Sequence, residues 1–172
     1  MSVSTSTAER VLSRIDGFVL RPLTAADAEA AAHVIRTAFA AQRRATHPPS
    51  SALRETADSI AGKMTAGGGF GALADGELVA VALWQVVDGD ALMIARVCVL
   101  PAFRGRSLSH ELVAACEREA RARGLGRARV RVRLELPENE RLFSRMGFQR
   151  LHVEAHAGFS APTVAIMEKR LK

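Results

Sequence analysis

The sequence contains no tyrosine, one tryptophan and only two cysteines among its 172 residues. Two thiols are too few for the disulfide framework of a small secreted domain. Cys98 and Cys116 each lie inside an apolar segment. A buried free thiol behaves as a small hydrophobe, so we interpret both as reduced core residues rather than a disulfide or a reactive site.

Long apolar runs are also missing. No window approaches the length of a membrane span. The first eight residues are rich in serine and threonine and have no apolar core of the kind found in signal peptides. We therefore expect a cytoplasmic protein with no membrane association.

Lysine is scarce, and arginine supplies 21 of the 24 basic residues. The formal net charge is +6, and 12 arginines fall between Arg104 and Arg150. A nucleic-acid surface would explain this pattern, but no aromatic residues alternate with the basic ones and no helix-turn-helix or zinc spacing appears. A small polyanionic ligand and a solvated arginine face account for it more simply. Nucleic acid is therefore the less favoured partner.

The length and composition predict one soluble domain. Hydrophobic residues make up 48% and charged residues 24% of the chain, which is an ordinary balance for a globular protein with its own core. We expect an N-terminal arm at residues 1–16, loose or a short helix, and a single domain at 17–172.

Turn residues and hydrophobic periodicity predict the order of elements. Asp75-Gly76 and Asp88-Gly89 are strong hairpin turns within a three-stranded meander. Residues 127–136 alternate arginine with apolar residues, as a half-buried strand does, and should pair parallel to the last meander strand. The predicted elements are strand 18–21, a helix through Phe39, helix 51–64 with Leu53 inward, a stop at Gly67, Gly68 and Gly69, strands 70–74, 78–87 and 92–100, helix 107–123, strand 127–136, a short helix from Pro137, and a hairpin of 151–155 with 163–169.

The stretch from Val97 to Ser109 combines a buried strand, a basic turn and a helix start. Pro101 ends the apolar run, and a turn containing Arg104 and Gly105 leads into a helical apolar stripe. Unpaired N–H groups at a helix start, together with arginines, attract phosphate. Many similar turns bind nothing, so the stretch alone leaves phosphate binding open.

Two motifs and the element order resemble the GNAT acyl-CoA N-acetyltransferases. Val97-x-Val99-x-Pro101-x-x-Arg104-Gly105-Arg106-x-Leu108 resembles the cofactor-binding signature, and Leu142-Phe143-Ser144-Arg145-Met146-Gly147-Phe148 resembles the "LYxxxGF" element. The resemblance covers residues 18–171. It implies an α/β (α+β) GNAT fold, in which a mixed sheet of six to seven strands is splayed between its fourth and fifth strands and flanked by about four helices.

The resemblance implies an enzyme that transfers an acetyl group from acetyl-CoA to a primary amine, on a small molecule or a protein N-terminus. The amine would attack directly in a ternary complex, with no metal. The Val97 N–H would be the catalytic donor to the thioester carbonyl. The implied cofactor-binding residues are Val97, Cys98 and Val99 for the pantetheine arm, Arg104, Gly105, Arg106, Ser107, Leu108 and Ser109 for the pyrophosphate, and Asn139 and Phe143 beside the pantetheine.

Two departures from the family pattern bear on chemistry. Ser107 and Ser109 stand where the family has glycine, then glycine or alanine. Serine is tolerable there if φ stays negative, and its hydroxyl can bind phosphate or cap its own helix. Phe143 replaces the tyrosine that protonates the leaving thiolate in many members. We expect water, or no acid at all, to serve instead.

Glu135 is the first candidate for the general base. Leu134-Glu135-Leu136 resembles the "LEV" of ribosomal-protein alanine acetyltransferases, where the glutamate is the base. The alternative is an ion-pair partner for Arg131 or Arg133 on the same strand face. Two other groups of polar residues are interpreted first as solvated faces. The alternative for His152, Glu154 and His156 is a metal site or a base, and the alternative for Glu55 and Asp58 is recognition of a cationic acceptor.

Three further points stay open in the sequence. A non-catalytic acyl-CoA-binding protein of the same fold is the main alternative, because of Ser107, Ser109 and Phe143. A basic nucleic-acid module is a distant third. The acceptor amine and the oligomeric state, including a homodimer, are not fixed by the residues.

Overall fold

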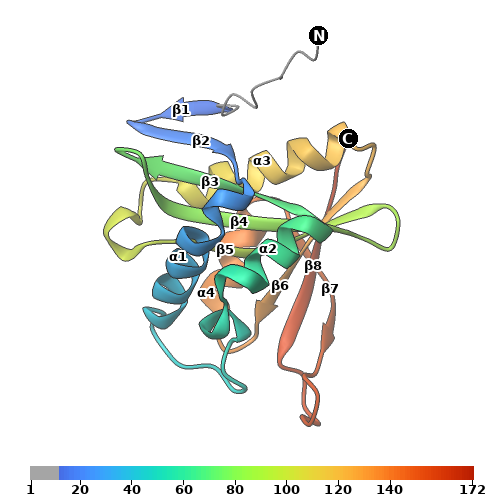
Figure 1. The fold of residues 1–172 in the computed structure, drawn as a ribbon. Helices are drawn as coiled ribbons and strands as arrows, with labels where there is room; N and C mark the ends of the chain where they lie inside the picture. The colour runs from blue at the N-terminus through green and yellow to red at the C-terminus, as the bar shows by residue number, and fades with distance from the viewer. Residues whose placement is uncertain (1–11) are drawn as a thin grey trace.

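The computed structural model describes residues 12–172 and contains one eight-stranded sheet in the order β1-β2-β3-β4-β5-β6-β8-β7 (Figure 1). The strands are β1 (Ser13–Ile15), β2 (Phe18–Pro22), β3 (Gly68–Ala74), β4 (Glu77–Val87), β5 (Ala91–Val99), β6 (Arg127–Arg133), β7 (Gln149–Glu154) and β8 (Val164–Arg170). The α-helices are α1 (Ala28–Ala40), α2 (Ala57–Ala66), α3 (Leu108–Ala122) and α4 (Pro137–Arg145), and the 3₁₀ turns are η1 (Ala25–Asp27), η2 (Ser51–Arg54) and η3 (Pro101–Phe103).

Strands β1 to β5 are antiparallel neighbours, and β3, β4 and β5 form the predicted three-stranded meander, whose two tight turns follow from the Asp-Gly pairs. Asp75 and Asp88 have φ values of 49° and 52°, and Gly76 and Gly89 have 80° and 74°. Two successive residues in the left-handed region give a turn whose twist matches that of the strands it joins. Both hairpins predicted at the Asp-Gly pairs are therefore confirmed.

Strands β5 and β6 are parallel, as predicted, but they pair over only part of their length. Residues Ala91 to Ile94 pair with Arg127 to Val130. Strand β5 continues to Val99 while paired only with β4. The sheet is thus splayed beyond Ile94, and one edge of β5 faces the opening.

The sheet has one strand more than the expected six to seven. Residues 13–15, predicted to belong to the N-terminal arm, form β1 and pair with β2, with Ser13 opposite Leu20. The splay between the expected fourth and fifth strands therefore lies between β5 and β6. Residues 1–11 of the expected arm lie outside the described residues.

The prediction of one continuous helix at 51–64 is wrong. The chain forms η2, leaves helical geometry at Glu55, and begins α2 after Thr56, whose side chain accepts a hydrogen bond from the Ser59 N–H. This capping box fixes the new start. As a result Leu53, expected to point inward, is 41% exposed.

The run of three glycines does more than end the helix. Gly67 closes α2, but Gly68 begins β3 directly opposite Trp84 of β4. A Cβ on Gly68 would lie 2.5 Å from the Trp84 ring. The absence of a side chain at Gly68 therefore leaves the space that the Trp84 ring occupies.

Helices α1 and α2 cover one face of the sheet, and α3 and α4 pack against the other (Figure 1). The two cysteines are free and buried, one in each core layer, as their apolar surroundings predict. Burial raises the pKa of Cys98 to about 12, so it is a neutral thiol. Within residues 12–172 no helix has the length and apolar character needed to cross a membrane.

Candidate active site

A β-bulge in β5 opens the sheet at the splay. Val81 lies opposite Cys98 and Leu83 lies opposite Ala95, so two steps along β4 match three along β5. Arg96, inside this irregularity, has a φ of 55°. A bulge bends the strand and re-aims its side chains. Here it turns the segment that begins at Val97 away from β6.

The main cleft, of about 480 Å³, lies where the splayed strand meets the starts of α3 and α4. Its walls come from the end of α1, the end of β5, the turn after it and α4. Ten of the residues predicted to bind the cofactor line it, namely Val97, Cys98, Val99, Arg104, Gly105, Ser107, Leu108, Ser109, Asn139 and Phe143.

The turn before α3 presents backbone donors to this cleft. The Glu111 N–H is bonded to the Ser107 carbonyl, so the N–H groups of Leu108, Ser109 and His110 have no carbonyl partner within the helix. All three residues line the cleft. An anion there would meet these groups and the positive end of the helix dipole.

Ser107 does not have the negative φ with which a serine is tolerable at this position. Its φ is 61° and its ψ is 17°, which is left-handed geometry, and its hydroxyl makes no capping hydrogen bond. A residue with a Cβ in this region costs about 1–2 kcal/mol. The site therefore keeps a strained serine whose hydroxyl is not engaged by its own helix.

The two arginines of the turn have different surroundings. Arg104 lines the cleft and donates from Nε to the Val99 carbonyl (3.4 Å) and from Nη2 to the Ala38 carbonyl (3.3 Å). Arg106 was also predicted to bind the cofactor. Its guanidinium lies 6.0 Å from the Phe18 ring centre, and it does not line the cleft. Arg104 is thus the arginine of this pair that lines the cleft, and the role predicted for Arg106 stays a prediction.

Phe143 is fixed by packing at the floor of the site. Its side chain is 7% exposed and meets Phe148 edge to face, with 5.7 Å between ring centres. It lines the cleft together with Asn139. The position that carries tyrosine in the related motif is thus a buried phenyl ring.

Glu135 lies outside both clefts and is bonded to the loop after α1. Its Oε1 accepts the His47 N–H at 2.8 Å, and its backbone carbonyl accepts from Arg44 at 3.2 Å. The His47 backbone N–H lowers the pKa of Glu135, with smaller contributions from the His47 ring and Arg133. A lower pKa makes a carboxylate a weaker base, so these bonds oppose the predicted catalytic role, which stays a prediction.

A second, smaller cleft of about 110 Å³ lies between the splayed strands. It shares Val97, Asn139 and Phe143 with the main cleft, so the two spaces meet at the opening of the sheet. No local pattern of residues predicts this cleft. Its charged lining residues are Arg96, Arg131 and Arg133.

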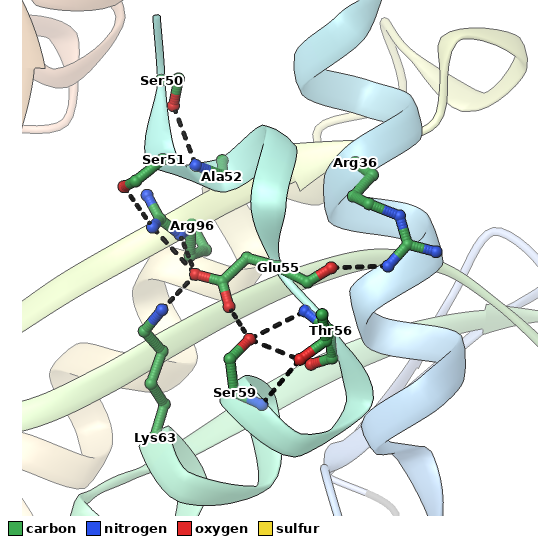
Figure 2. Close-up of polar contacts among 9 residues, drawn as sticks. All are labelled: Arg36, Ser50, Ser51, Ala52, Glu55, Thr56, Ser59, Lys63 and Arg96. Atoms are coloured by element: carbon green, nitrogen blue, oxygen red, sulfur yellow. Dashed lines mark hydrogen bonds and ion pairs between the residues drawn. The ribbon is translucent and has the colours of Figure 1, made fainter.

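A buried carboxylate beneath this cleft holds Arg96. Glu55, interpreted from the sequence as part of a solvated face, is only 2% exposed. Figure 2 shows its carboxylate surrounded by Arg96, Lys63 and the Ser59 hydroxyl. The Arg96 Nε and Nη2 donate to Glu55 Oε1 at 3.1 and 2.9 Å. The network fixes the bulge one residue before Val97.

The histidine-rich hairpin strand forms local pairs. His152 Nε2 lies 2.9 Å from Glu154 Oε1, and His156 Nδ1 lies 2.5 Å from the Thr163 hydroxyl. Within residues 12–172 no group of three or more histidine, cysteine, aspartate or glutamate side chains is placed to hold a metal ion.

Comparison with known proteins identifies the family. The model of the acetyltransferase (GNAT) family matches residues 32–148, more than half of the chain. A search of curated proteins found no match.

Solved structures share the fold at low sequence identity. The ribosomal-protein-S18-alanine N-acetyltransferase of Escherichia coli is 20% identical, with a TM-score of 0.72 over 90% of this chain and 94% of that one. The PaiA N-acetyltransferase of Thermoplasma acidophilum in complex with coenzyme A is 19% identical, with a TM-score of 0.72 over 89% and 98%. YncA of Salmonella typhimurium with its cofactor acetyl-CoA is 17% identical, with a TM-score of 0.68 over 91% and 95%. The chain belongs to the acetyltransferase (GNAT) family.

Proposed function

We propose that this protein transfers an acetyl group from acetyl-CoA to a primary amine by direct attack in a ternary complex. One observation carries the proposal: an unpaired edge of β5 and the N-terminus of α3 face the same 480 Å³ cleft. Such an edge binds an extended chain of amides, and such a helix start binds phosphate. In CoA, the amide-containing pantetheine arm is followed directly by the pyrophosphate, so one molecule carries both groups.

The donor binds along the cleft in two parts. The backbone of residues 97–99 pairs with the pantetheine amides as an added strand would. The pyrophosphate lies against the N–H groups of Leu108 and Ser109, with Arg104 and the Ser107 hydroxyl as further donors. Asn139 and Phe143 border the pantetheine from α4.

The chemistry requires few protein groups. The Val97 N–H donates to the thioester carbonyl oxygen, which becomes negative as the amine nitrogen bonds to the carbonyl carbon. The tetrahedral intermediate then loses the C–S bond, and CoA leaves as a thiolate. The proton of the amine passes to water, because Glu135 is bonded to His47 outside the cleft.

A non-catalytic acyl-CoA-binding protein is the second candidate function. Two observations favour it: Phe143 has no proton to give, and Ser107 is in left-handed geometry where the family has glycine. The two candidates share the donor site and differ only in turnover. Measurement of turnover therefore separates them.

The test has two parts, performed on the purified full chain. Thermal unfolding is measured with CoA and with pantetheine, which lacks the pyrophosphate; we expect stabilisation by CoA and much less by pantetheine. Release of free thiol from acetyl-CoA is then followed with a panel of primary amines, with an amine-free control for hydrolysis. Stabilisation without thiol release from any amine supports the binding protein instead. No effect of CoA refutes both.

A further inference from the structure

The arginines of β6 follow one face of the strand, and most of them are neutralised. Residues 127, 129, 131 and 133 alternate with apolar residues, so their side chains share a face. The first three each meet a carboxylate from a neighbouring segment, in the pairs Arg127–Asp90 (2.6 Å), Arg129–Glu168 (2.7 Å) and Arg131–Glu154 (2.9 Å).

Arg133 is the exception on this face. Within residues 12–172 it has no ion-pair partner, and its Nη1 is buried with no hydrogen-bond acceptor. Burial lowers the pKa of Arg133, and the charge of Arg131 lowers it further, while the charge of Glu135 opposes the change. A guanidinium nitrogen that is buried without a hydrogen-bond acceptor is costly. The position therefore favours an anion supplied from outside the chain.

The surroundings of Arg133 place that anion in the smaller cleft. Among the described residues that line it there is no aspartate or glutamate, and Arg96 is neutralised by Glu55. Val97 lines the same cleft. Val97 and Arg133 each lie three residues beyond Ile94 and Val130, the last pair joining β5 to β6. The unpaired cation and the proposed thioester donor thus face one opening.

We infer that the acceptor is a small amine that carries a carboxylate, and that Arg133 binds this carboxylate while the amine approaches Val97. The inference rests on the proposed acetyl transfer. A guanidinium binds a carboxylate through two parallel hydrogen bonds. The cleft of about 110 Å³ holds roughly four water volumes, which is room for a carboxylate and a few carbon atoms.

The kinetic test compares each acid with its amide. Thiol release is measured with α-amino acids, β-alanine and γ-aminobutyrate, each paired with its carboxamide. We expect the acids to have the higher kcat/KM. For the best acid, Arg133→Gln should lower kcat/KM by about 10–100-fold, the loss of one charge-assisted contact, chiefly through KM. Its amide should change little, and Arg127→Gln, on the same strand but paired with Asp90, serves as the matched control.

A binding measurement removes the dependence on turnover. Thermal unfolding in the presence of CoA is followed with N-acetylalanine and with N-acetylalaninamide. We expect stabilisation by the acid, lost in Arg133→Gln and kept in Arg127→Gln. Equal effects of acid and amide, or no change in Arg133→Gln, overturn the inference even when amines are acetylated. Failure of acetyl transfer itself is recognised separately, by the absence of thiol release with every amine.

Discussion

Replacing Glu55 by glutamine should destabilise the protein, because it removes the charge of a buried carboxylate that binds two basic side chains. Glu55 is 2% exposed, and its carboxylate accepts from Arg96, Lys63 and Ser59 (Figure 2). Glutamine keeps the size of the side chain but removes the charge and puts an NH₂ group among donors. Two basic side chains then face no anion.

The magnitude follows from which partners can return to water. The Lys63 side chain is 44% exposed and can turn to solvent, so its loss costs little. The Arg96 side chain is 18% exposed, and it makes two hydrogen bonds to the carboxylate. Hydrogen bonds to charged groups contribute about 1.5–3 kcal/mol each. A loss of about 3 kcal/mol corresponds to a fall in Tm of roughly 6–12 °C for a chain of this size.

The same network makes the effect depend on pH. Burial alone would raise the pKa of Glu55, but hydrogen bonds from Lys63, Ser59 and Arg96 outweigh it and lower the pKa. Since the folded pKa lies below the unfolded value of about 4.3, the stabilisation is complete above that value. It is lost as pH falls through the folded pKa. The difference in the free energy of unfolding between wild type and Glu55→Gln should therefore become smaller at acid pH.

The assay is thermal or urea unfolding at pH 7 and pH 3, with Asp58→Asn as the matched control. Asp58 lies on the same helix but is exposed. We expect a change of less than about 1 kcal/mol for the control. Equal stability of the two variants at pH 7 would refute the reasoning.

Three further predictions concern the proposed donor site and the candidate base. Arg104→Ala should raise the Kd for CoA about 10–100-fold by calorimetry, since it removes one charge-assisted phosphate contact; an unchanged Kd excludes Arg104 from the site. Ser107→Gly should raise Tm by about 2–4 °C, because it relieves about 1 kcal/mol of left-handed strain; a lower Tm contradicts that reasoning, and weaker CoA binding would reveal a role of the hydroxyl. Glu135→Gln should leave CoA binding intact and lower kcat less than tenfold, whereas a fall of 10²-fold or more would identify it as the base.

The sequence predicted the parts of the fold that depend on neighbouring residues. The Asp-Gly turns need only two residues with positive φ, and Asp75 and Asp88 supply them with the glycines that follow. The parallel pairing of β5 with β6 follows from the helix that connects them. Most of the proposed donor cleft could be located for the same reason, since residues 97–109 are one continuous strand-turn-helix.

The remainder depends on contacts between distant segments. The break between η2 and α2 accompanies a carboxylate that binds Arg96, 41 positions away, and no local pattern shows whether a glutamate will be buried. The bulge at Arg96 has no glycine to mark it. Arg129 and Arg133 are the same residue type on the same strand face, and acidic side chains from distant segments, Asp88 and Glu168, leave Arg129 paired while Arg133 is not.

Because the chain has no tyrosine, no tyrosine hydroxyl can protonate the leaving CoA thiolate. The proposed chemistry does not require this protonation. A thiol with a pKa of about 8.5 leaves as its anion at a cost of roughly 2 kcal/mol at pH 7, since each pKa unit is worth about 1.4 kcal/mol. This cost is smaller than the contribution of a well-placed general acid, which is 10²–10⁴-fold in rate, or about 2.7–5.5 kcal/mol. A buried Phe143 is therefore compatible with turnover, and in the proposed mechanism the oxyanion donor at Val97, worth about 10²–10³-fold when such a donor is removed, contributes more than protonation of sulfur.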